Sequence, residues 1–178
     1  MTRKNPDCVF AEELWHRYAE SIMRTLFSYE ADAQLREDLA QDVFLALLNS
    51  VSAVMNAENE KAYVFRIVHN VAVDHIAKAV KQRTDYLEPN RLNELQDAQR
   101  VSAVPSPAAH VSKNQQREQL LRAVSQMSAP NRQVIALLLE DFSQHEIADI
   151  LLLRGNTVRV RINRAKAELR RLLGPHGS

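Results

Sequence analysis

Residues 143–178 carry two apolar periods separated by a short break, and this pattern constrains the fold more than any other. Ser143 stands three residues before Glu146, which is the spacing of a capping box that begins a helix. The apolar period that follows breaks at 154–156, where glycine and asparagine tolerate positive φ. From Thr157 a second period advances by four or three residues through Val158, Ile162, Ala165, Leu169 and Leu172. The segment therefore predicts two helices joined by a tight turn.

The second of these helices is strongly basic on the faces that its apolar stripe leaves outward. From residue 154 onward, Glu168 is the one acid against six arginines and one lysine. Val160 and Asn163 lie roughly opposite the stripe, where an aliphatic group can meet a thymine methyl and an amide can meet a base edge. A solvated face normally mixes both charge signs, so the imbalance favours contact with phosphate. The pair of helices is typical of a helix-turn-helix that reads duplex DNA.

Charge alternates in blocks along the chain, although the net charge is only +1. Residues 1–60 hold eleven acids against five bases, whereas residues 61–84 hold five bases against Asp74 alone. Two separated basic blocks suggest two contacts with nucleic acid. The acidic block should face a different partner.

The composition favours an all-α chain, because 46% of the 178 residues are hydrophobic, only three are glycine, and no alternating strand pattern competes. Residues 85–113 contain three prolines among small polar residues and show no apolar period, which indicates a flexible linker. We therefore expect two small helical domains, 1–84 and 114–178, joined by that linker. The second domain contains the helix-turn-helix.

One helix of the first domain, around residues 60–81, is apolar over most of its circumference but carries a polar stripe. Arg66, Asn70 and Asp74 follow one another at four-residue steps. Arg66 and Asp74 could belong to an ion-pair network along the helix. Asn70 fits the other interpretation better, in which the stripe holds unstacked bases of a single strand, with Tyr63 and His69 on the same surface.

Other features predict little chemistry. Cys8 is a lone cysteine and cannot form an internal disulfide. Glu13 with His16 makes one Glu-x-x-His pair, but a di-metal bundle needs two such pairs. The sequence shows no nucleophile elbow and no glycine-rich phosphate loop. We therefore expect no enzyme activity, no cofactor and no bound metal. With neither an export signal nor a membrane span, the chain is expected to be cytoplasmic.

Three segments taken in order carry a resemblance to a known family: LREDLAQDVFLALL, EKAYVFRIVHNVAVDHIAKAVKQR and APNRQVIALLLEDFSQHEIADILLLRGNTVRVRINRAKAEL. Together they resemble the extracytoplasmic-function (ECF) group of bacterial sigma factors, in the sigma-70 family. The AYVFRI and AVDH runs most resemble the iron-siderophore branch. The resemblance implies a promoter-specificity subunit that works with core RNA polymerase and promoter DNA. It also implies an anti-sigma partner, and we expect the chain to be a monomer.

The resemblance also implies site residues. Those expected to dock on the polymerase clamp are Asp38, Gln41, Asp42 and Phe44. Those expected to melt and capture the promoter −10 element are Asn56, Lys61, Tyr63, Arg66, His69, Asn70, Lys78 and Lys81. Those expected to read the −35 element are Arg154, Asn156, Thr157, Arg159, Val160, Arg161, Asn163 and Arg164, with Lys166 and Arg170 on phosphate.

The chain departs from the family pattern at three places, one of which is a thinner basic run that contains Lys78, Lys81 and Arg83. Leu152 and Leu153 stand where the hairpin turn commonly has glycine and a small polar residue, and Tyr63 replaces a common tryptophan. Two other functions remain open. A stand-alone helix-turn-helix regulator would bind duplex DNA without polymerase. A protein adaptor would bind protein partners through its helices, and its basic end would make only non-specific contacts. Neither alternative predicts a second basic block.

Overall fold

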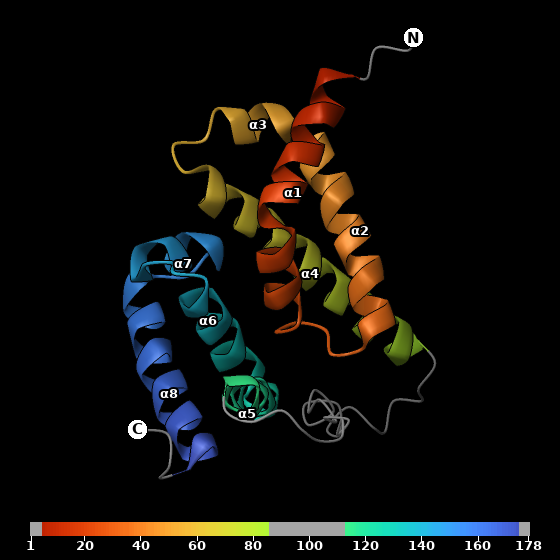
Figure 1. Cartoon of the computed structure of the whole chain (residues 1–178). Coiled ribbons are helices and arrows are strands. Elements are labelled where there is room, and N and C mark those ends of the chain that lie inside the picture. The colour runs from red at the N-terminus through yellow and green to blue at the C-terminus, as the bar shows by residue number, and fades with distance from the viewer. Residues whose placement is uncertain (1–4, 86–112, 175–178) are drawn as a thin grey trace.

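The computed structural model describes residues 5–85 and 113–174, and this part of the chain is helical with no strand. We call the first four helices the N-terminal module: α1 (Pro6–Leu26), α2 (Ala33–Asn49), α3 (Val51–Met55) and α4 (Glu60–Asp85). The other four form the C-terminal module: α5 (Lys113–Gln126), α6 (Ala129–Leu139), α7 (Gln144–Ile150) and α8 (Gly155–Leu173). The all-α prediction is confirmed (Figure 1). Apart from its two ends, the predicted linker at 85–113 lies outside the described residues.

Local sequence explains where the first helices begin. The side chain of Asn5 accepts a hydrogen bond from the Asp7 amide at the start of α1, and Asp32 accepts bonds from two amides at the start of α2. Each side chain satisfies helix N–H groups that have no partner within the helix. The short helix α3 was not expected. It follows α2 after a single break at Ser50, and Val51 and Val54 are buried on its inner side.

The capping box at the start of α7 is present as predicted. Ser143 Oγ accepts from the Glu146 amide at 3.3 Å, and the Glu146 carboxylate accepts from the Ser143 amide at 2.7 Å. Three positions of the predicted stripe on α8 are buried, namely Val158, Ile162 and Ala165. The helix-turn-helix is therefore formed by α7 and α8.

The turn between these helices lies earlier than the sequence suggested. We placed the positive φ near Gly155 and Asn156, but Leu152 has φ 54° and Gly155 is already the first residue of α8. The Leu153 amide donates to the Ala148 carbonyl at 2.9 Å, the bond that closes a helix C-terminus when the preceding residue is left-handed. A leucine in this conformation is strained, so hydrogen bonding and packing, not glycine, fix the turn.

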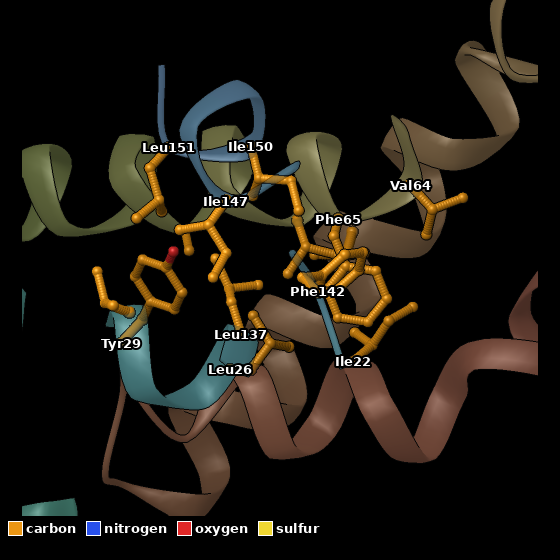
Figure 2. Packing of buried hydrophobic residues seen from close by; sticks show 14 of the residues in the cluster. Ile22, Leu26, Tyr29, Val64, Phe65, Leu137, Phe142, Ile147, Ile150 and Leu151 are labelled. Carbon is orange, nitrogen blue, oxygen red and sulfur yellow. The ribbon is translucent and has the colours of Figure 1, made fainter. Parts of the chain in front are cut away.

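The two modules pack directly against each other on one continuous apolar core. Figure 1 shows α7 beside α4 and α6 beside α1. Figure 2 shows buried side chains of the two modules interleaved where these helices meet. The N-terminal module contributes Ile22, Leu26, Tyr29 and Phe65 to this region, and the C-terminal module contributes Leu137, Phe142, Ile147, Ile150 and Leu151. None of the helices in the described ranges is long and apolar enough to cross a bilayer.

We predict that Ser143→Ala lowers the free energy of unfolding by about 1 kcal/mol, because the Glu146 amide at the start of α7 loses the hydroxyl that caps it. Urea denaturation followed by circular dichroism measures the change. Ser52→Ala is the matched control, since Ser52 is exposed within α3. An equal loss in both variants would contradict the capping role.

Candidate functional site

The outer surface of α8 carries positive charge that no acid of its own helix neutralises. Arg159, Arg164 and Lys166 are exposed. Glu168 turns away from them and binds the start of α6, where its carboxylate accepts from the Ser128 amide at 3.0 Å and the Asn131 side chain at 2.6 Å. Burial would raise the pKa of Glu168, but these hydrogen bonds outweigh it and hold the pKa below its usual value. The one acid of the basic end therefore has a structural role.

The predicted −35 residues share this outward surface. Val160 is 45% exposed, which is costly for an aliphatic side chain in water and agrees with its predicted outward position. Arg161 is half-buried. The other exposed members are Arg154, Asn156, Thr157, Arg159, Asn163, Arg164, Lys166 and Arg170. Since the helix that carries them is the second of a helix-turn-helix, the surface can enter a major groove.

The polar stripe of α4 also points outward. Arg66, Asn70 and Asp74 are exposed, as are Lys78 and Lys81 further along the helix. The ion pairs found among the described residues do not include Arg66 or Asp74. An ion-pair network along the helix is therefore absent from this part of the chain, and the side chains are available to a ligand.

The structure does not bring the remaining predicted −10 residues onto that stripe. His69 is half-buried, and its Nδ1 lies 2.8 Å from the hydroxyl of Tyr29, which follows α1. Lys61 is half-buried and donates to the Glu140 carbonyl of the C-terminal module at 2.7 Å. Tyr63 is also half-buried, whereas Asn56 is exposed and donates to the Ser52 carbonyl. The exposed stripe therefore consists of Arg66, Asn70 and Asp74 with Lys78 and Lys81 beyond them.

His69 should make stability depend on pH. Burial lowers the pKa of His69 below its ordinary value of 6.5 and raises the pKa of Tyr29, so both groups favour their neutral forms and share a hydrogen bond. Because the unfolded chain binds the proton more readily, this stability is complete above pH 6.5 and is lost as the pH falls below it. We predict that His69→Gln removes this part of the pH dependence in urea denaturation. An unchanged slope between pH 7 and pH 5.5 would contradict it.

Two of the predicted docking residues, Gln41 and Phe44, line a groove between α1 and α2, whereas Asp38 and Asp42 are not among its lining residues. Asp38, Gln41 and Asp42 are exposed on α2, and Phe44 packs edge-on against Trp15 with ring centroids 5.7 Å apart. The groove has a volume of about 700 Å³ and is largely apolar, with Trp15, Met23, Phe44 and Leu45 among its lining residues and Glu12 and Glu37 beside them. An apolar floor with acidic edges suits a partner that presents an apolar side chain flanked by positive charge.

Sequence reasoning missed several residues that organise these surfaces. Trp15 lines the groove but lies one position beyond the apolar series of α1, so periodicity did not select it. As the single tryptophan of the chain it was still a usable signal, because tryptophan is enriched at binding sites. Glu140 and Arg132 were not identified, because nothing in their local sequence marks them as buried. Their contacts join residues more than a hundred positions apart.

Comparison with known proteins identifies two family regions in order along the chain. Residues 14–82 match the family model for sigma-70 region 2, and residues 117–169 match the one for sigma-70 region 4. The RNA polymerase sigma factor YlaC of Bacillus subtilis is 22% identical over 161 residues, covering 90% of each chain. The ECF RNA polymerase sigma factor SigE of Mycolicibacterium smegmatis is 26% identical over 169 residues, covering 94% of this chain and 63% of that protein.

Solved structures show the same fold. The sigma factor RpoE of Bartonella quintana, in complex with the anti-sigma factor NepR, aligns with a TM-score of 0.69 at 22% identity and covers 93% of this chain and 99% of that one. CnrH, in complex with the cytosolic domain of CnrY, aligns with a TM-score of 0.60 at 20% identity and covers 95% and 97%. With the two family matches in order along the chain, the protein belongs to the sigma-70 family of RNA polymerase sigma factors, in its ECF group.

Proposed function

We propose that this ECF sigma factor docks on core RNA polymerase through the acidic face of α2, captures the −10 element with α4 and reads the −35 element with α8. The observation that carries the proposal is the separation of charge among three elements. In the part of the chain that the structure describes, exposed acids lie on α2, and exposed basic residues lie on α4 and α8. A protein that only bound duplex DNA would need one basic surface, whereas this chain presents two.

The roles of the three surfaces follow from their chemistry. The α8 surface has arginines and two exposed asparagines on a recognition helix, which suits base edges and phosphates of a duplex. The α4 stripe has Arg66 and Asn70 on a helix exposed to solvent, which suits bases of an opened strand. Asp38 and Asp42 repel DNA and attract a basic protein surface. Each DNA-binding surface alone is small. Binding of both promoter elements by one polymerase-bound chain therefore raises the overall affinity for the promoter.

Transcription in vitro tests the proposal. Core polymerase free of sigma factor is incubated with genomic fragments, with and without the purified chain, and the 5′ ends of the transcripts are mapped. Start sites that depend on the chain are expected. Tight binding of the chain alone to the same duplex fragments, with no chain-dependent transcript, would instead support the stand-alone regulator.

Single substitutions on α8 should separate specificity from affinity. Asn163→Ala is predicted to relax base preference at one position of the −35 element, at a cost of about 1–3 kcal/mol in discrimination. Lys166→Ala and Arg170→Ala should weaken binding about equally on all sequences and reduce its dependence on salt. Competition binding of the holoenzyme to single-base promoter variants measures both effects. A uniform loss for Asn163→Ala would contradict its assignment to a base edge.

The same proposal includes an anti-sigma partner, because apolar docking surfaces such as the α1–α2 groove need cover when polymerase is not bound. One of the two aligned structures is of a sigma factor in complex with an anti-sigma factor, which supports this step. Purification of the tagged chain from its native cells at normal abundance should recover a stoichiometric inhibitor. Constitutive activity of the free chain in those cells would count against it.

We also place the chain in the iron-siderophore branch, as a monomer acting in the cytoplasm where polymerase is found. The branch assignment rests on the AYVFRI and AVDH runs of α4. Transcripts from the mapped start sites should then respond to iron limitation. An iron-independent response would remove the branch assignment and leave the sigma-factor function intact.

A further inference from the structure

The recognition helix α8 runs alongside α6 (Figure 1). In its first half, Val158 and Ile162 belong to the main apolar core. Further along, Ala165 joins a second and smaller buried cluster, against which Leu169 and Leu172 pack while staying only partly buried. Apolar contact has no preferred direction, so these small and half-buried residues leave the rotation of the last turns of α8 weakly determined.

Glu168 adds directional contacts in this part of α8. Its carboxylate accepts from the Ser128 amide at 3.0 Å, from the Ser128 hydroxyl at 3.3 Å and from the Asn131 side-chain amide at 2.6 Å. Ser128 is the N-cap of α6, yet its own side chain makes no capping bond to that helix. An acid of α8 therefore caps α6, and a carboxylate at this position also complements the positive end of the α6 dipole.

Glu168 makes these bonds although cations of its own helix are close in sequence. Arg164 precedes it by four residues and Arg171 follows it by three, which are the spacings at which acids and bases pair along a helix. The ion pairs found in the described part of the chain join Glu168 to neither arginine. Both arginines are exposed. The bonds to α6 therefore hold the acid in place and leave both guanidinium groups available to a ligand.

Helix α6, to which this acid binds, is itself held in place. Val134 and Leu137 are buried in the main core. Arg132, which is 3% exposed, donates from Nε to the Ser28 carbonyl at 2.8 Å and from Nη1 to the Ser125 carbonyl at 3.3 Å. A buried guanidinium is costly without such acceptors, so α6 tolerates little rotation. A bond from α8 to the start of α6 therefore fixes α8 relative to the rest of the C-terminal module.

The same bonds determine the direction of the side chains expected to read bases. Asn163 precedes Glu168 by five residues, which is about 140° around the helix and about 7.5 Å along it. The two residues therefore project from different faces of one helix, Glu168 toward α6 and Asn163 toward solvent. A rotation that breaks the bonds to α6 also moves the Asn163 amide, and a recognition group must stay within about 0.5 Å of its productive position.

We propose that Glu168 is a positioning residue for −35 recognition, because its bonds to Ser128 and Asn131 set the rotation of α8 and thereby the sequence preference of the chain. Glu168 acts through α8 and not by contact with DNA. The inference rests on the proposed role of α8 and adds how the fold holds that helix for base reading. An acid with a merely structural role would change stability and leave the sequence preference unaltered.

Sequence preference tests the role. Holoenzyme is formed from core polymerase and the full chain, and the discrimination ratio is its affinity for a mapped promoter divided by its affinity for the same fragment with one −35 base changed. Glu168→Ala removes all three bonds and should lower this ratio by roughly tenfold, which is the scale of one well-placed base contact. Loss of a negative charge raises the affinity for both fragments alike, so bulk electrostatics cannot lower the ratio.

Further variants separate geometry from charge. Asn131→Asp places a second carboxylate against Glu168 and should lower the ratio as Glu168→Ala does, although it adds a negative charge. An acid in the first turn favours α6, so the loss would not come from melting of that helix. Combining Asn131→Asp with Glu168→Gln restores a carboxylate–amide pair and the original net charge, and should return the ratio toward that of the unmodified chain. Glu118→Gln, which removes one exposed negative charge from α5, should leave the ratio unchanged.

A distance measurement tests the positioning without DNA. Cys8 is the one cysteine of the chain, so Cys8→Ser permits nitroxide labelling at Leu139→Cys on α6 and Ala167→Cys on α8. Both labelled positions are exposed. Double electron-electron resonance should give a narrow distance distribution in the otherwise unmodified chain and a shifted or broadened one with Asn131→Asp. The combined variant should restore the narrow distribution.

The outcomes separate this inference from the proposed function. An unchanged distance distribution, or an unchanged ratio in folded Glu168→Ala and Asn131→Asp, overturns the positioning role even if chain-dependent start sites are found. An equal fall of the ratio in Glu118→Gln assigns the effect to charge and overturns it too. If the unmodified holoenzyme prefers no −35 sequence, the proposed function fails, and the distance measurement still decides whether Glu168 positions α8. If circular dichroism shows that Glu168→Ala loses helix content, Asn131→Asp provides the same comparison.

Discussion

Reversing both acids on the exposed face of α2, by Asp38→Arg with Asp42→Arg, should reduce binding of the chain to core polymerase by about a hundredfold. The acids lie one helical turn apart on α2, and both are exposed. Placing arginines against a basic partner surface costs several kcal/mol through like-charge repulsion, and each 1.4 kcal/mol is tenfold in affinity. Fluorescence titration of labelled chain with core polymerase measures the loss, and chain-dependent transcription should fall with it.

The matched control is Glu118→Arg with Asp149→Arg, which changes the net charge equally. Both residues are exposed on the C-terminal module, with side chains 60% and 64% exposed. Any general effect of added positive charge on DNA or polymerase would appear in both variants. An equal loss in the two would mean that α2 has no special role. Circular dichroism should show unchanged helix content in either case, since no buried group is altered.

The helix-turn-helix could be predicted from the sequence because its determinants are local. Ser143 and Glu146 are three residues apart, and the capping box that they form needs no distant partner. The apolar stripe of α8 likewise follows from spacing alone. The turn was misplaced because a left-handed leucine is unfavourable in isolation. The fold supports it through the Leu153 amide and through buried neighbours that propensity rules do not include.

The candidate site was only partly predictable, because some of its residues change role through tertiary contact. His69 stands one residue before Asn70 and near Arg66, so sequence placed all three on one surface. The fold instead buries much of His69 against Tyr29. Lys61 was expected to be free for DNA, but Glu140 lies 79 positions away in the sequence and no local pattern links the two. Exposed helical surfaces follow from periodicity, whereas contacts between modules depend on docking that periodicity does not encode.

Phe65→Ala should lower the free energy of unfolding by about 3–5 kcal/mol, which is the usual cost of a large cavity in a packed core. Phe65 is 1% exposed and lies between Tyr18 and Phe142, with ring centroids at 6.4 Å and 4.9 Å. Urea denaturation followed by circular dichroism measures the loss. Leu121→Ala is the control, since Leu121 is 44% exposed and its truncation should change stability by no more than about 0.5 kcal/mol.

Phe142→Ala then shows whether the two modules unfold as one unit. If the shared core couples them, Phe142→Ala destabilises the N-terminal helices as well, and all probes report one transition. The double variant should lose less than the sum of the single losses, by about 0.5–1.5 kcal/mol for the lost aromatic contact. A separate, unshifted transition of the N-terminal helices in Phe142→Ala would show that they fold independently. The shared core would then contribute too little free energy to couple the two modules.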